Sequence, residues 1–274
     1  MRESIGIIGF GNMGSAIGEQ LKSRYKIWVN DLDKNKTNNL TEINIADNIT
    51  DLVSKVGTII LAIKPQDFDI VLNEIKDNTK GKLAVSIAAG ITTKYIENRL
   101  GETRVVRVMP NLPAKVSKGM ICLCKGKLAD KEDLNFVEEV FSYLGRTLIL
   151  NEEMMDAATA VSGSGPGYFF DLIQDKKQEE WEVYARNTFI PALSASAQQI
   201  GFTTEQSGVL AVATAEGSIA LLRATGLTPQ ALCIQVTSKG GTTAAGLEEL
   251  HKTNSLSAAV KAAKKRAEEL SGKE

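Results

Sequence analysis

The sequence predicts an α/β protein whose N-terminal part is a doubly wound, mostly parallel sheet and whose C-terminal part is all α-helical. Over residues 1–125, short β-branched runs alternate with polar, helix-like stretches, as in a parallel sheet with helices on both faces. After Asn151, strand-like runs nearly vanish and alanine-rich helical stretches take over. We therefore expect two domains, residues 1–151 and residues 152–274.

The expected elements of the first domain follow one another in a regular order. Apolar, β-branched runs predict strands over 4–9, 26–30, 58–63, 83–87, 104–108, 119–124 and 146–150. The stretches between them predict helices over 12–23, 34–40, 48–55, 66–77, 92–99 and 130–144. Right-handed crossovers between successive strands then give the doubly wound arrangement.

The second domain is expected to be helical over 152–161, 191–200, 204–223 and 255–270. Two Gly/Ser-rich segments, Ser162–Gly167 and Ser238–Thr243, are expected to interrupt it. The helices are amphipathic and their shared core is thin, which favours packing against other helices in a dimer or a larger homo-oligomer.

The composition excludes several classes of partner. Hydrophobic residues make up 43% and charged residues 24% of the chain, as in ordinary globular proteins. A formal net charge of -1 argues against nucleic-acid or membrane-surface binding. We expect neither a signal peptide nor a membrane helix, because no uninterrupted apolar run approaches ~18 residues. Three cysteines without framework spacing favour a reducing compartment, so we expect a cytoplasmic protein.

Metal and histidine chemistry are not expected. His251 is the only histidine, which argues against a histidine-based triad and a multi-histidine metal site. Cys122 and Cys124 lie two apart on an expected strand, so both point to one face. They are either a metal or redox pair or two small packed residues, and no Cys or His cluster accompanies them.

A glycine motif follows the first expected strand directly. Ile8 leads into Gly9-Phe10-Gly11-Asn12-Met13-Gly14, and a helix opens there. This strand, turn and helix match the dinucleotide fingerprint of a Rossmann-like domain. Gly9 permits the tight turn, Gly11 lets the backbone approach a pyrophosphate, and Gly14 lets the helix pack closely. We therefore predict that Ile8 to Gly14 bind a dinucleotide at the helix N-terminus.

Asp31 ends the second expected strand, where a carboxylate can accept hydrogen bonds from the adenosine ribose and repel a 2′-phosphate. This interpretation predicts a preference for NAD(H). A solvated loop acid beside Asp33 is the alternative, and Lys34 and Lys36 remain available to a 2′-phosphate.

Further candidates follow other strands, at the sheet edge where ligands bind in this architecture. Ala62-Ile63-Lys64-Pro65 ends the third strand, and Ile87-Ala88-Ala89 ends the fourth, where small residues admit a flat ring. Asn111, between two prolines, either contacts a ligand or caps a turn. Lys64 is either near the cofactor or a surface lysine.

A second glycine-led segment lies far along the chain. Gly240-Gly241-Thr242-Thr243 precedes an expected helix near Ala244. Successive N–H groups at a helix N-terminus form an anion site, and the threonine hydroxyls add donors. Such a loop can hold a substrate carboxylate without an arginine. Ser162–Pro166 either does similar work or lets helices pack closely.

In this series of motifs the chain resembles the pyrroline-5-carboxylate reductase family. The resemblance runs from Gly9–Gly14 through Ala62–Pro65, Ser86–Gly90 and Met109–Ala114 to Ser162–Pro166 and Val236–Thr243. It implies NAD(P)H-dependent reduction of 1-pyrroline-5-carboxylate to L-proline, and a helical dimerisation domain. It places the dinucleotide at Gly9–Gly14 and Ala62–Pro65, the nicotinamide half beside Ile87–Ala89, and the substrate carboxylate at Gly241, Thr242 and Thr243. It also implies ligand contacts for Glu152 and Gln235, which we assign to substrate and cofactor. No catalytic side chain is assigned, because the hydride comes from the cofactor.

Two departures from the family pattern stand out. Lys239 occupies a position where many members have proline. The stretch between Pro166 and Gly201 is longer than usual, and Asp171–Glu182 within it is highly charged. This insertion is either a longer solvated helix or an excursion before Phe189, or else it alters the dimer interface or access to the site.

Two other functions compete with this one. A related imine reductase or β-hydroxy-acid dehydrogenase is the first, but β-hydroxy-acid enzymes need a base, and residues 152–170 contain no lysine. A nucleotide-binding regulator without activity is the second, and the intact Gly240–Thr243 loop argues against it.

Overall fold

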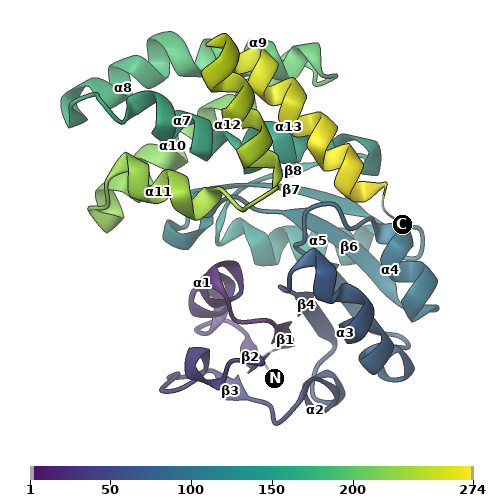
Figure 1. The fold of residues 1–274 in the computed structure, drawn as a ribbon. Coiled ribbons are helices and arrows are strands. Elements are labelled where there is room, and N and C mark those ends of the chain that lie inside the picture. Colours follow the sequence, from purple (N-terminus) through teal and green to yellow (C-terminus); the bar gives the residue numbers. More distant parts are fainter. Residues whose placement is uncertain (1–2, 273–274) are drawn as a thin grey trace. The chain divides into compact units, whose positions relative to one another are not determined.

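The computed structural model describes residues 3–272, and its eight strands form one sheet in the order β3-β2-β1-β4-β5-β6-β7-β8 (Figure 1). The neighbouring strands from β3 to β6 all pair in parallel. The first six positions reproduce the strand order of dinucleotide-binding domains, which confirms the predicted fold class. The strands are β1 (Ser4–Ile8), β2 (Lys26–Asn30), β3 (Asn44–Ile45), β4 (Thr58–Leu61), β5 (Leu83–Ser86), β6 (Arg104–Met109), β7 (Gly119–Lys125) and β8 (Gly145–Ile149).

The register of the strands determines which loops lie side by side. Ile8 at the end of β1 pairs with Asn30 on one side and Leu61 on the other. Leu61 in turn pairs with Ser86 of β5. Four strands therefore end level with one another, and the segments that follow them form one edge of the sheet.

Backbone contacts divide the chain into two compact units. Within residues 3–272, unit 1 comprises residues 3–108 and 123–143, and unit 2 comprises residues 109–122 and 144–272. The predicted domain boundary between residues 151 and 152 stays a prediction.

Five α-helices belong to the described part of unit 1. Leu52, Phe68 and Ile96 from three of them are fully buried against the sheet residues Ile59 and Val105. β1, β4 and β5 are buried on both faces over most of their length, which explains their nearly continuous apolar sequences. The helices are α1 (Asn12–Leu21), α2 (Ile49–Ser54), α3 (Phe68–Ile75), α4 (Thr93–Leu100) and α5 (Lys131–Ser142).

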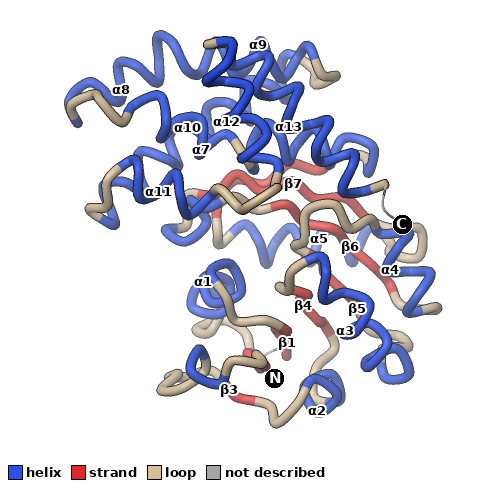
Figure 2. The backbone as a smooth tube through the Cα atoms, in the orientation of Figure 1, coloured by secondary structure: helices blue, strands red, loops and turns tan. Residues whose placement is uncertain are grey.

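Unit 2 is largely helical, and its helices are blue in Figure 2. Within the described part of the chain, α10 alone is long and apolar enough by composition to cross a membrane, and 56% of the window concerned is buried. α10 packs against α7 and α9 within the unit, as a core helix does. The helices are α6 (Met155–Ala158), α7 (Gly165–Ile173), α8 (Trp181–Tyr184), α9 (Ile190–Gln199), α10 (Thr204–Thr225), α11 (Pro229–Val236), α12 (Thr242–Thr253) and α13 (Leu256–Ser271).

Two predicted elements were wrong. Residues 34–40 do not form an α-helix: a 3₁₀ turn covers only Lys34–Lys36, and Asn39 has a left-handed φ of 64° that ends helical structure. The Ser162–Gly167 segment does not interrupt the helices with a loop. A π-helical turn, Thr159–Gly163, joins α6 nearly directly to α7.

The charged insertion leaves the helical path and returns to it. α7 ends at Ile173, a short loop follows, and the chain resumes as a 3₁₀ turn (Gln178–Glu180) leading into α8. A second π-helical turn, η8 (Ala185–Phe189), links α8 to α9. The insertion is therefore an excursion and not one longer helix.

Candidate functional site

The glycine turn after β1 has the geometry that a bound dinucleotide needs. Gly9 has a φ of 92°, a conformation that side chains disfavour, and a Cβ there would lie 2.5 Å from the carbonyl oxygen of Ala62. A Cβ on Gly14 would overlap the carbonyl oxygen of Gly9. A Cβ on Gly11 would meet nothing within 4 Å. The turn is thus tight on its inner side and open at Gly11, where a ligand can approach the backbone.

The N-terminus of α1 presents its N–H groups without competition from a side chain. Gly11 is the N-cap and has no side-chain hydrogen bond to the first turn, and no acidic residue lies in that turn. Ser15 donates its hydroxyl to the Gly11 carbonyl at 2.8 Å, which ties the turn to the helix. The N–H groups of this first turn and the helix dipole therefore favour an anion here.

Asp31 is buried, not solvated, and it supports the glycine turn. Its carboxylate accepts hydrogen bonds from the Phe10 N–H at 2.6 Å and the Asp33 N–H at 2.8 Å, and Lys36 pairs with it at 3.2 Å. Burial alone would raise the pKa of Asp31, but these donors outweigh burial and hold the pKa below its usual value. The acid thus fixes the glycine turn to β2, and ribose binding by Asp31 stays a prediction.

The other candidate cofactor residues follow β4 and β5 at the same edge. Ala62 and Ile63 are half-buried, whereas Lys64 and Pro65 are exposed. Ile87 and Ala89 are half-buried around the buried Ala88. The structure therefore brings these residues into line with the glycine turn, because β4 and β5 end level with β1.

A second helix N-terminus, in unit 2, carries the hydroxyl groups. Gly240 has a φ of 70°, and Gly241 is the N-cap of α12 with no side-chain cap. α12 begins at Thr242, two residues before the predicted start, so both threonines lie in its first turn. Ser164 lies 3.0 Å from the Thr242 hydroxyl and accepts a hydrogen bond from the Thr243 hydroxyl at 3.1 Å. Ser164, Thr242 and Thr243 form what we call the hydroxyl cluster.

Small residues on α7 allow this cluster to form. A Cβ on Gly167 would lie 2.5 Å from the γ-methyl group of Thr243, and a Cβ on Gly165 would lie 2.7 Å from that of Thr214. The missing side chains let α10 and α12 approach α7 closely. For Ser162–Pro166 we considered ligand binding and close helix packing, and the contacts observed are those of close packing. This packing brings Ser164 next to Thr242 and Thr243.

Sequence reasoning missed two residues that contact this loop or the helix that follows it. Arg266 of α13 donates from Nε to the Gly240 carbonyl at 2.8 Å. Tyr168 of α7 is fully buried with its hydroxyl against Gly246 of α12. Burial raises the pKa of Tyr168, an effect that the nearby Ser164 hydroxyl partly offsets, so the phenol stays neutral. The sequence offered only weak signals for these two residues: Arg266 is a basic residue on an amphipathic helix, and Tyr168 is an aromatic residue that follows a glycine.

Three further candidates also lie in unit 2. Asn111 donates to the Ser162 carbonyl at 3.0 Å and accepts from the Met120 N–H at 2.9 Å, so it acts as a buried structural link. Gln235 is exposed on α11 and accepts from Lys115 Nζ at 3.3 Å, and burial lowers the pKa of Lys115. Glu152 is half-buried at the start of a 3₁₀ turn. Ligand contacts of Glu152 and Gln235 stay predictions.

Comparison with known proteins identifies the relatives of this chain. Residues 186–270 match the family model for pyrroline-5-carboxylate reductase dimerisation, and residues 4–90 match that for coenzyme F420-dependent NADP oxidoreductases. The pyrroline-5-carboxylate reductase of Methanosarcina acetivorans is 34% identical, with 99% of each chain covered. The chain belongs to the pyrroline-5-carboxylate reductase family.

Solved structures of pyrroline-5-carboxylate reductases agree with this assignment. The Coxiella burnetii enzyme is 30% identical, covers 99% of each chain and has a TM-score of 0.68. The Plasmodium falciparum enzyme, solved with NADP bound, is 29% identical, covers 98% of each chain and has a TM-score of 0.64.

Among residues 3–272, no group of three or more His, Cys, Asp or Glu side chains is placed to hold a metal ion.

Proposed function

We propose that this protein reduces 1-pyrroline-5-carboxylate to L-proline with NAD(P)H, the last step of proline biosynthesis. The observation that carries the proposal is the full-length similarity to pyrroline-5-carboxylate reductases, at 34% identity over 99% of the chain. The two glycine-led helix N-termini support it, because one fits a pyrophosphate and the other offers hydroxyl donors to a carboxylate.

The reaction requires little acid–base catalysis from the protein. The substrate is a cyclic imine, and its protonated form is already electrophilic at carbon. When bound, the reduced nicotinamide supplies the hydride. The chain positions the reacting rings, an effect worth ~7–11 kcal/mol of barrier in well-oriented reactions. No histidine or other strong acid is required, which agrees with the single histidine in the sequence.

Each site residue has a proposed role. The backbone N–H groups at the N-terminus of α1 bind the pyrophosphate, and Asp31, which accepts from the Phe10 N–H, holds the glycine turn in place. The N–H groups of α12 and the Thr242 hydroxyl bind the substrate carboxylate, and Thr243, whose hydroxyl donates to Ser164, contributes its backbone N–H and holds the hydroxyl cluster in place. The remaining proposed contacts are Ile8, Gly9–Gly14, Ala62–Pro65, Ile87–Ala89 and Gln235 for the cofactor, and Gly241 and Glu152 for the substrate.

The direct test is an assay of the purified protein with pyrroline-5-carboxylate and either NADH or NADPH, followed at the nicotinamide absorbance band. We expect oxidation of at least one cofactor and formation of L-proline. Oxidation only with other cyclic imines would replace the substrate and keep the reaction class. Cofactor binding without turnover of any imine would leave only a nucleotide-binding protein and overturn the proposal.

We also propose that the protein is a cytoplasmic homodimer assembled through its helical part. The match of residues 186–270 to a dimerisation model supports the assembly. The cytoplasmic location is supported by the three cysteines, which lack the spacing of a disulfide framework and form no disulfide among residues 3–272. Sedimentation of the purified chain at micromolar concentration tests the assembly, and a monomer there would contradict it.

A further inference from the structure

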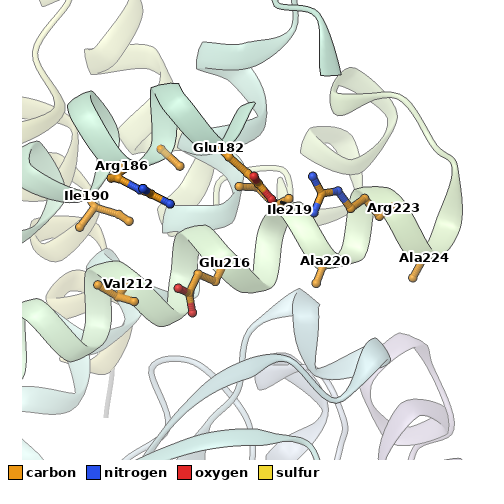
Figure 3. A pocket seen from close by; sticks show the side chains of 10 residues that line it. Glu182, Arg186, Ile190, Val212, Glu216, Ile219, Ala220, Arg223 and Ala224 are labelled. Atoms are coloured by element: carbon orange, nitrogen blue, oxygen red, sulfur yellow. Dashed lines mark ion pairs between the residues drawn. The ribbon is translucent and has the colours of Figure 1, made fainter. Parts of the chain in front are cut away.

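The polar side chains of unit 2 differ in whether water can satisfy their hydrogen bonds. A groove of about 890 Å³ along α10 has four charged residues in its lining, and all four are exposed: Glu182, Arg186, Glu216 and Arg223 (Figure 3). The contact between α7 and α12 contains the opposite case. There the Tyr168 hydroxyl is fully buried and makes no hydrogen bond within the described residues. A buried donor without a partner is costly, so this hydroxyl needs an explanation.

The position of Tyr168 on α7 directs its side chain toward the hydroxyl cluster. Ser164 is the N-cap of α7, and Tyr168 lies four residues later, so both are on one side of the helix. Side chains on a helix lean toward its N-terminus, which for Tyr168 is the side of Ser164. From α12, Gly246 contacts the phenol, because a Cβ there would lie 2.4 Å from the Tyr168 oxygen. Gly246 lies one turn after Thr242, so the phenol lies between the two helices that carry the cluster.

The donors and acceptors of the hydroxyl cluster determine the direction of its hydrogen bonds. A serine hydroxyl can accept two hydrogen bonds and donate one. The Thr243 hydroxyl donates to Ser164 at 3.1 Å and occupies one of the two acceptor positions. In the contact of 3.0 Å between Ser164 and Thr242, either hydroxyl can be the donor. The group that occupies the second acceptor position of Ser164 therefore decides whether Thr242 donates to Ser164 or outward to a ligand.

Resting on the proposed function, we propose that Tyr168 is a positioning residue for the substrate carboxylate, because its hydroxyl donates to Ser164 once the substrate is bound. Ser164 then accepts from Tyr168 and Thr243 and donates to the Thr242 oxygen, so the Thr242 hydroxyl donates outward to the carboxylate. A phenol is a stronger donor and a weaker acceptor than an aliphatic hydroxyl, which favours this direction over the reverse. Burial raises the pKa of Tyr168, so the phenol keeps its proton.

Tyr168, Ser164 and Thr242 form what we call the hydroxyl relay. Without the phenol, the second acceptor position of Ser164 is open to Thr242. Thr242 then donates inward and presents only lone pairs to the substrate, which repel a carboxylate. Tyr168 thus acts through Ser164 and Thr242 and does not touch the substrate itself.

A double-mutant cycle tests the hydroxyl relay. Tyr168→Phe keeps the ring that packs on Gly246 and removes only the phenolic oxygen. It should raise the KM for pyrroline-5-carboxylate about 3-fold to 10-fold, with kcat and the Kd of NAD(P)H little changed. Thr242→Val should raise the KM by itself, and adding Tyr168→Phe to it should raise the KM no further. Thr242→Ser keeps the hydroxyl and should keep the sensitivity to Tyr168→Phe.

The controls separate the relay from folding and from the proposed function. Tyr184→Phe removes a half-buried phenol of α8 and should leave the KM unchanged, and circular dichroism checks that each variant is folded. An unchanged or lowered KM in Tyr168→Phe would overturn the relay and leave the proposed function intact. Effects of Tyr168→Phe and Thr242→Val that multiply would also overturn it, because the phenol would then act through packing alone. An unmodified chain that does not turn over pyrroline-5-carboxylate would contradict the proposed function and the relay together.

Discussion

The two glycine-led helix N-termini resemble each other in their backbone and differ in their surroundings. α1 and α12 both follow a glycine of positive φ, Gly9 at 92° and Gly240 at 70°, and both have a glycine N-cap without a side-chain hydrogen bond. Around α1 the tight contacts come from backbone atoms of Gly9 and Ala62. Around α12 they come from hydroxyl and methyl groups.

This difference corresponds to the two ligands that we assign to them. A pyrophosphate carries several equivalent oxygens, and successive N–H groups with a helix dipole suffice to bind it. A carboxylate on a small ring must also be oriented, and the hydroxyl cluster adds directional donors. The comparison predicts that the first site is sensitive to backbone changes and the second to the loss of single hydroxyls.

The largest expected effect is that of Gly9→Ala. The new Cβ would strain a φ of 92° and press on the Ala62 carbonyl, so we expect a stability loss of about 1–3 kcal/mol and loss of NAD(P)H binding. Gly11→Ala is the matched control, because its Cβ meets no protein atom; it should fold normally and bind the cofactor less well. Thermal unfolding and fluorescence titration measure both effects. Equal destabilisation of the two variants would contradict the proposal that Gly9 is needed for the tight turn and Gly11 for the approach of the ligand.

Thr243→Val should have the next largest effect, and on the substrate only. Valine keeps the shape but removes the hydroxyl that donates to Ser164, so kcat/KM for pyrroline-5-carboxylate should fall roughly 10-fold to 100-fold. The Kd of NAD(P)H should be unchanged, and Thr243→Ser should restore most of the activity. A larger loss of cofactor binding than of substrate binding would show that this helix end has another ligand.

Arg266→Gln should produce a smaller change at the same helix. The variant weakens the support of the Gly240 carbonyl, and the KM for the substrate should rise about 3-fold to 10-fold with kcat little changed. Lys265→Gln, on an exposed neighbouring position, is the control. Identical kinetics for the two variants would remove Arg266 from the site.

The smallest effect concerns acid stability at the first site. The pKa of Asp31 is lower in the folded protein than its ordinary value, so its stabilising contribution is present above that value and is lost as the pH falls through the folded pKa. Asp31→Asn should therefore flatten the acid side of the pH–stability curve. Thermal unfolding between pH 2.5 and pH 6 measures the slope, and parallel curves for both proteins would contradict this account.

The sequence predicted the elements around the first candidate site more completely than those around the second, for a physical reason. The ends of β1, β4 and β5 lie within two residues of their predicted positions, because apolar runs that stop at small or polar residues mark them locally. The short β3 (Asn44–Ile45) was missed because two residues carry no periodicity. The helix predicted over residues 34–40 was wrong, because nothing in this polar run of the sequence indicates the positive φ of Asn39.

The second site depends on contacts between residues far apart in the chain. Ser164 contacts Thr242 and Thr243 only because Gly167 lets α12 approach α7 closely. From the sequence alone, the same glycine-rich motif predicted a break between helices. Nothing near Arg266 in the sequence indicates that it supports Gly240. Tertiary packing, and not local sequence propensity, determines both the hydroxyl cluster and the contact of Arg266 with Gly240.

The late position of Thr243 in the sequence also determines when each site can form during synthesis. The glycine turn, Asp31 and the Ala62 carbonyl that packs on Gly9 have all been made once residue 62 is joined. The hydroxyl cluster requires Thr243, about 180 residues later, which at 5–20 residues per second takes roughly 10–40 s. A nascent chain therefore contains every residue of the glycine turn long before the cluster that we assign to the substrate can close.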